Sequence, residues 1–190
     1  MSILNLNNSR TLAVAAIALA AGVAAYAQPA SGAAPSGTSS AGSSVARADH
    51  NFVEKAAKGG MAEVELGNLA QQRAANDQVK QFGARMVTDH TKANDELKSI
   101  ASAKGITLPA PGKGEMKDMD KFGKMTGTDF DKAYMKHMVS DHKKDVSLFE
   151  KESKSGKDPE LKAFAAKTLP TLREHLQLAQ QVNDAVKSAK

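Results

Sequence analysis

The residues of this 190-residue chain best suited to chemistry are histidines in a repeated pentapeptide. MVTDH ends at His90, and MVSDH ends at His142. Side chains of an α-helix share a face at spacings of three and four residues, so apolar neighbours show which way a histidine points. His90 follows Met86 by four residues and His142 follows Met138 by four, and His175 also falls on an apolar stripe. The pattern predicts three inward-facing imidazoles, whereas His137 is expected at the solvent and His50, at a frayed helix start, is given no role.

A carboxylate is expected at the same level as these imidazoles. In an antiparallel helical hairpin, two residues lie opposite each other when their numbers average to the turn. The last two inward histidines average to about 158.5, where Asp158-Pro159 is a strong helix-start signal. Reflection of His90 through a turn at residues 76–77 leads to Glu63, on the inward stripe of the first helix. Each of four helices therefore contributes one side chain: Glu63, His90, His142 and His175.

Three imidazoles and a carboxylate are ligands typical of transition metals rather than of calcium or magnesium. The sequence predicts a single ion, of iron, zinc or copper, and the thioethers of Met86 and Met138 could favour copper(I). A second interpretation stays open, in which Glu63 hydrogen-bonds the imidazoles and the layer gives the bundle specificity without chemistry. Acidic residues that directly precede the histidines, such as Asp89, are expected at the surface or as acceptors for a neighbouring imidazole.

Four long helices must position these residues. Apolar residues recur at helical spacing from residue 49 onward, and strand-like alternation is missing. The first helix is expected from about 49 to 75, and the second from a cap at Asn76 or Asp77 to Gly105. The third is expected to begin at TDFD, where Thr128 and Asp131 resemble a capping box, and to end at KSGKDPE. The fourth is expected from Asp158-Pro159 onward. Residues 105–127 form a long connection with a turn or two of helix. The fold class is all-α: a ferritin-like bundle of two antiparallel hairpins joined by a long crossover.

The N-terminal part reads as a targeting region. Residues 1–27 resemble a signal peptide, with an apolar run and AYA before a cleavage site after Ala27. Residues 28–47 form a Gly/Ser/Ala/Pro spacer, and residues 48–187 form the helical domain. We therefore expect a periplasmic or secreted protein, with no membrane-spanning segment after cleavage of the signal. Cysteine is absent, which excludes disulfides and thiolate metal sites.

Charge and composition argue against several classes of function. The formal charge is +5, and lysines alternate with acids instead of clustering, while aromatic residues make up 4%. A nucleic-acid surface is therefore not expected. No phosphate-binding loop, nucleotide fingerprint or Ser-His-Asp pattern occurs, so an enzyme is the less favoured reading. The sequence identifies no protein partner, and an oligomer is compatible with it.

Four segments together resemble the bacterial exported family named domain of unknown function 4142 (DUF4142): GGMAEVELGNLA, VKQFGARMVTDHTKANDELKSIASAKGITLP, FDKAYMKHMVSDHKKDVSLFEKE and DPELKAFAAKTLPTLREHLQLA. The resemblance covers about residues 48–187. It implies a ferritin-like fold in proteins often labelled outer-membrane or exported, with no firmly assigned activity. It also implies that Glu63, His90, His142 and His175 are motif positions.

The expected site departs from that of the di-iron ferritin-like enzymes. Those enzymes use Glu-x-x-His motifs, but the residues three before the inward histidines are Val87, Val139 and Leu172. A mononuclear site is therefore expected. The function expected is that of an exported bundle that binds a transition metal for metal handling or stress protection. The alternative is a non-enzymatic envelope interaction or stress module whose His/Glu layer is structural.

Overall fold

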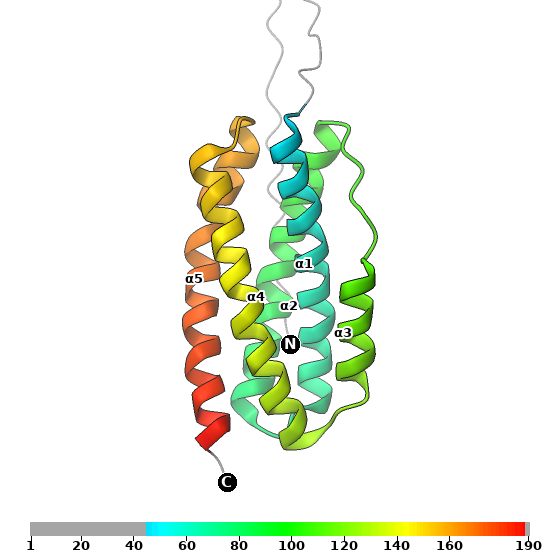
Figure 1. Ribbon diagram of the computed structural model, residues 1–190, viewed down its shortest axis with the longest axis vertical. Coiled ribbons are helices and arrows are strands. Elements are labelled where there is room, and N and C mark those ends of the chain that lie inside the picture. The colour runs from blue at the N-terminus through cyan, green and yellow to red at the C-terminus, as the bar shows by residue number, and fades with distance from the viewer. Residues whose placement is uncertain (1–44, 189–190) are drawn as a thin grey trace, which may run out of the picture. The chain divides into compact units, whose positions relative to one another are not determined.

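The computed structural model describes residues 45–188, and the expected signal peptide and nearly all of the spacer lie outside them. The described part contains α1 (Arg47–Arg73), α2 (Asp77–Ala103), α3 (Lys113–Gly123), α4 (Gly127–Ser155) and α5 (Pro159–Ser188). Helix α1 packs mainly on α2 and α4 mainly on α5, and the long connection with α3 joins the two hairpins (Figure 1). The predicted all-α four-helix bundle is confirmed.

The ends of the long helices follow the capping signals of the sequence. The Asn76 side chain accepts a hydrogen bond from the backbone N–H of Gln78, which caps α2. The Asp158 side chain likewise accepts from two N–H groups in the first turn of α5. After α2, Gly105 adopts φ +68°, the left-handed conformation that glycine reaches without steric strain.

The capping box expected at Thr128 is wrong. Helix α4 begins at Gly127, and its N-cap Thr126 makes no side-chain capping bond. Asp131 instead accepts hydrogen bonds from the backbone N–H groups of Ala75 and Asn76, in the turn of the other hairpin. A long-range partner thus replaces the local one that the motif predicted.

Two buried aspartates join the hairpins in this reciprocal way. Asp131 on α4 binds the α1–α2 turn, while Asp49 on α1 accepts hydrogen bonds from the backbone N–H groups of Lys157 and Asp158 in the α4–α5 turn. Hydrogen bonds to an ionised acceptor are about twice as strong as neutral ones. The two aspartates fix the level of each hairpin against the other and so align the residues of the bundle's interior.

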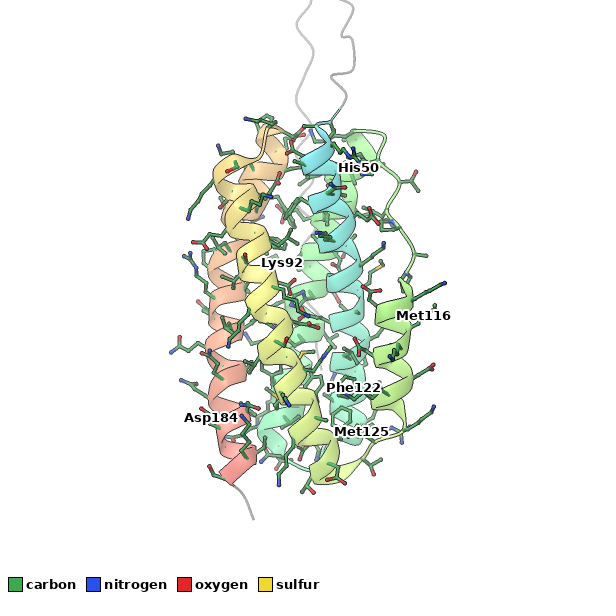
Figure 2. All side chains as sticks on the ribbon, viewed as in Figure 1. His50, Lys92, Met116, Phe122, Met125 and Asp184 are labelled. Atoms are coloured by element: carbon green, nitrogen blue, oxygen red, sulfur yellow. The ribbon has the colours of Figure 1, made fainter. Side chains whose placement is uncertain are left out.

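The crossover contains more helix than expected, 11 residues rather than a turn or two. Helix α3 lies beside α1 on the outside of the bundle (Figure 1). Its Phe122 is fully buried, whereas Met116 near its other end is 54% exposed (Figure 2). One aromatic side chain therefore anchors this helix.

The interior of the bundle consists of two apolar clusters. One, around Phe82, Phe130 and Tyr134, lies toward the α1–α2 turn, and the other, around Phe52 and Phe164, lies toward the α4–α5 turn. On each long helix, the predicted site residue falls between members of the two clusters. A polar layer therefore interrupts the core at one level.

Helices α1 and α2 approach closely near that layer because two glycines face each other. A Cβ at Gly67 would lie 2.7 Å from the carbonyl oxygen of Gly83, and a Cβ at Gly83 would lie 2.7 Å from the Cβ of Ala70. Neither backbone can move cheaply, so the contact requires glycine. Within residues 45–188, no helix combines the length and the apolar character needed to cross a bilayer.

Candidate metal centre

The four predicted site residues meet in the interior of the bundle, one from each long helix. Glu63 is 2% exposed, His90 6%, His142 0% and His175 1%. The imidazole ring centroids lie 5.3–5.8 Å from one another. One nitrogen of each ring lies within 4.8 Å of a nitrogen of the other two.

The fold fixes the tautomer of His142. Its Nδ1 lies 3.0 Å from the carbonyl oxygen of Met138, one turn earlier on α4. A carbonyl oxygen only accepts, so Nδ1 carries a proton, and in the neutral ring the lone pair is on Nε2. That Nε2 atom is buried and has no hydrogen-bond partner. The repeated Met-Val-Ser-Asp-His segment therefore presents one unprotonated nitrogen to the interior.

His175 is oriented from the neighbouring helix. Its Nε2 donates to the carboxylate of Asp89 on α2 at 2.8 Å, which leaves the lone pair on Nδ1, also buried and without a partner. Asp89 is held in turn by Arg85, which also binds Glu174. A carboxylate that accepts from the far nitrogen of a histidine is the common way in which proteins orient metal ligands and raise their basicity.

Glu63 lies against two of the three imidazoles. Its Oε2 is 2.5 Å from Nε2 of His90 and its Oε1 is 3.3 Å from Nδ1 of His142, contacts that lack hydrogen-bond alignment. The nitrogen of His142 nearest to Glu63 is the one that faces Met138. The carboxylate thus pairs with His90 and lies on the outer side of His142, and the group of converging ligand atoms comprises the three histidines alone.

Glu63 and the imidazoles shift one another's pKa values. Burial alone would raise the pKa of Glu63, but the imidazoles of His90 and His142 outweigh it and lower the pKa to about 2. Burial likewise opposes protonation of His90, yet the Glu63 carboxylate raises the pKa of that imidazole. Burial lowers the pKa of His175 to about 4, against the opposing effect of Asp89. The Glu63 carboxylate and the His90 imidazole therefore stabilise each other's charged forms, whereas burial favours the neutral form of His175.

The donor set fits a transition metal. Buried polar atoms without partners are rare in native proteins, yet His142 and His175 each have one, and Nε2 of His90 has only the contact with Glu63. Nitrogens that share one ion lie roughly 3–4 Å apart, because metal–nitrogen bonds are about 2.0–2.1 Å. Rings whose nitrogens already lie within 4.8 Å need only small rotations to reach that spacing.

Two polar residues beside the layer were missed by the sequence reasoning. Asp145 lies one turn after His142 on α4, and Asn94 lies one turn after His90 on α2, and both line a small cavity next to His90. Burial and the charge of Glu63 raise the pKa of Asp145 well above its ordinary value. The signal that could have found them is their spacing of three and four residues from the site histidines.

The remaining histidines are not part of the layer. His50 is exposed. His137, expected at the solvent, is largely covered: its side chain is 18% exposed, its Nε2 lies 2.9 Å from Asp141, and its ring lies 5.1 Å from that of Phe122. The crossover helix covers it, which helical phase within α4 could not reveal.

Comparison with known sequences identifies the family. The profile described as Domain of unknown function (DUF4142) matches residues 34–182. The chain belongs to the DUF4142 family. The match begins before the first described residue and ends inside α5. None of the curated proteins matches the sequence.

Three solved structures share the fold of this DUF4142 protein at low sequence identity. A DUF305 fragment from Deinococcus radiodurans is 12% identical, with a TM-score of 0.65 over 74% of this chain and 98% of the other. A secreted DUF305 protein from Streptomyces coelicolor is 13% identical, with a TM-score of 0.63 over 74% and 92%. CopM in its Cu(II)-bound form is 16% identical, with a TM-score of 0.59 over 72% and 96%. At such identities the likeness concerns the fold alone.

Proposed function

We propose that this DUF4142 protein is an exported helical bundle that binds a single transition-metal ion in its core, for metal handling or stress protection. His90, His142 and His175 are the ligands, and Glu63 pairs with two of them. The observation that carries the proposal is the convergence of three buried imidazoles, of which His142 and His175 each have a nitrogen without a hydrogen-bond partner, while His90 faces Glu63. Two of those rings have their lone pairs directed by Met138 and Asp89.

The ion is iron, zinc or copper. Imidazole nitrogen suits all three, and no thiolate is present to favour another choice. A fold neighbour carries copper in its Cu(II)-bound form, which makes copper the first ion to test. Three histidines leave one coordination position for a small exchangeable ligand, as in open zinc sites.

Binding of the ion changes the proton content of the layer. A metal ligand must be unprotonated, so a His90 side chain that carries a proton in the metal-free protein would release it on binding the ion. The Glu63 carboxylate that stabilised the imidazolium then stabilises the positive charge of the ion. The metal supplies the charge and any redox chemistry, and the chain supplies a dry, pre-oriented set of nitrogens.

Export is part of the proposal. The apolar run and the AYA sequence of residues 1–27 support a cleaved signal, and a fold neighbour is described as a secreted protein. We therefore place the mature protein in the periplasm or outside the cell, where residues 28–47 form a spacer before the helical domain. Mass spectrometry of the protein from its native cells tests this part, since the mature chain should begin at Gln28.

The experiment for the site is equilibrium metal binding to untagged, metal-free protein. The parent should bind about one equivalent of Cu(II), Zn(II) or Fe(II), and an ion at 100 times its Kd should add about 2.7 kcal/mol of stability. For a domain of this size that gain raises Tm by roughly 5–10 °C. His142→Ala and His175→Ala should each abolish the rise, whereas His50→Ala, at an exposed position, should preserve it. Unchanged binding in both interior variants would contradict the site.

A second candidate function has its own observation. Glu63 contacts both His90 and His142, so the layer satisfies part of its polarity without an ion. In that case the layer is structural, and the protein is a non-enzymatic interaction or stress module of the envelope. This alternative predicts no dependence of Tm on any divalent ion, so the same titration separates the two candidates.

A further inference from the structure

Because the three imidazoles are at most 6% exposed, an ion can reach them only across the wall of the bundle. A small cavity of about 20 Å³ lies directly beside His90, lined also by Gly60, Asn94, Asp145 and Thr168. That volume is about that of one water molecule. Most of its lining is apolar, and Asn94, Asp145 and Thr168 place polar groups among the apolar ones. The cavity is therefore a small space at the edge of the metal layer.

A surface cleft lies on the other side of the same wall. It runs between α1 and α4 beside the start of α3, and Gly59, Glu115 and Asp141 contribute to its lining. Asp145 lines both the cleft and the inner cavity. The carboxyl group of this residue therefore separates the solvent from the cavity next to His90.

Two adjacent glycines thin the α1 side of the wall. A Cβ at Gly60 would overlap Oδ1 of Asn94, so the amide occupies the space of a side chain there. A Cβ at Gly59 would meet only Oδ1 of Asp145, at 3.8 Å. At these two positions helix α1 therefore has no side chain between its backbone and the polar groups of Asn94 and Asp145.

One carboxyl group of the cleft, that of Asp145, is free to bind a cation. Asp145 makes no hydrogen bond and no ion pair with any other residue of the described range 45–188. Its oxygens are free for an arriving ion, which would displace any proton to the water of the cleft. Four lysines also line the opening, of which Lys58 is paired with Glu54 at 2.6 Å and Lys144 with Asp141 at 2.8 Å. The other two, Lys55 and Lys151, make no ion pair within residues 45–188 and repel an arriving cation, so the carboxylate of Asp145 has to offset their charge.

A second cleft, on the α2–α5 face, is a poorer route. It is lined by Asp89, Glu96, Lys167 and Thr168 among others. Ala93 and Thr168 line both this cleft and the inner cavity, but neither carries a charge that could bind a passing cation. The one carboxylate of this cleft near the layer, Asp89, is already held by His175 and Arg85.

Because Asp145 lines both the α1–α4 cleft and the cavity beside His90, we infer that its carboxyl group binds a divalent metal ion in passage between the cleft and the histidine layer. The inference rests on the proposed metal site and adds the route to it. Asp145 binds the ion transiently and is not one of its resting ligands. Loss of the carboxylate therefore slows uptake and release by the same factor and leaves the equilibrium affinity unchanged.

The experiment measures Co²⁺ uptake by the metal-free full chain in stopped flow, through the visible absorption of the bound ion, with release followed by a chelator chase. In Asp145→Asn both rates should fall by about tenfold or more, the scale of charge effects in focused clefts, with the same Kd. Gly59→Leu, which covers the cleft with an apolar side chain and favours the helix, should slow both rates as well. Glu96→Gln, which removes a carboxylate from the other cleft, is the matched control and should behave as the parent.

Parental rates in both Asp145→Asn and Gly59→Leu would overturn the inference. Slower exchange in Glu96→Gln alone would move the route to the α2–α5 face and overturn it as well. A weaker Kd in Asp145→Asn through faster release would make Asp145 a resting ligand rather than a group that binds the ion in passage. Failure of the parent to bind Co²⁺ or Cu²⁺ at equilibrium would remove the proposed function itself, and this inference with it.

Discussion

Replacement of His175 by glutamine should remove a defined part of the acid sensitivity of the metal-free protein. His175 is 1% exposed, and burial lowers its pKa from 6.5 to about 4. The unfolded chain therefore binds this proton more tightly than the folded chain does. The stability that the neutral imidazole contributes is complete above about pH 6.5 and is lost as the pH falls toward 4.

The size of the effect follows from the two pKa values. One pKa unit corresponds to about 1.4 kcal/mol, so a fall from 6.5 to about 4 corresponds to about 3 kcal/mol. In the His175→Gln variant the side-chain amide could still donate an N–H to Asp89, so the variant keeps that contact and loses the titration. Glu63 and His90 titrate in both proteins, and their contributions cancel in the comparison.

Urea unfolding of both proteins in the presence of a chelator, at several pH values from about 4 to 8, measures the difference directly. The parent should lose about 3 kcal/mol more than His175→Gln between pH 6.5 and 4. Parallel profiles would refute the reasoning, because they would mean that His175 is protonated in the folded state or lies in contact with water. Protonation would also remove the free Nδ1 lone pair that the metal site requires.

Three further predictions concern the frame around the site. Gly67→Ala should lower the free energy of unfolding in urea by roughly 1–3 kcal/mol, because its Cβ meets the backbone of Gly83. The control Gly59→Ala should be neutral or stabilising by up to about 1 kcal/mol. A stabilised Gly67→Ala variant would contradict the close helix contact. Asp49→Ala should lower the free energy of unfolding by about 2–5 kcal/mol, seen as a lower Tm, because the N–H groups of the α4–α5 turn lose their acceptor. A Tm within a degree or so of the parent would contradict the role of Asp49 in joining the two hairpins. Asp89→Asn should weaken metal affinity about 10–100-fold with the stoichiometry kept, and equal affinity in a competition titration would show that Asp89 does not orient His175.

Much of the fold could be predicted because its signals are local. Helical periodicity, the Asn76 and Asp158 caps and the left-handed Gly105 are short-range features, and each acts in the structure as expected. The level of the site followed from hairpin geometry, since errors of one or two residues in a turn move a side chain by only about 3 Å along the axis.

The features that could not be predicted depend on contacts between distant segments. The Thr128 capping box failed because Asp131 finds its partners in the other hairpin's turn. The cover over His137 required the position of α3. Glu63 was placed at the right level, but only coordinates show that it lies beside His90 and on the outer side of His142.

The repeated pentapeptide illustrates the same limit. Its two histidines both face the interior, as phase within each helix predicts. The aspartates before them diverge: Asp89 reaches across to His175, while Asp141 pairs with His137 on its own helix. The local sequence is nearly the same in both copies, so the difference arises from the residues of the neighbouring helices that lie beside each aspartate.

The central claim is that three imidazoles of one chain hold a single ion, and X-ray absorption spectroscopy of the copper-loaded mature protein tests it most directly. The account predicts one copper per chain and the outer-shell scattering of three histidine rings, reduced to two in His142→Ala if any copper stays bound. Copper bound without imidazole scattering, or an unchanged spectrum in that variant, would contradict the account.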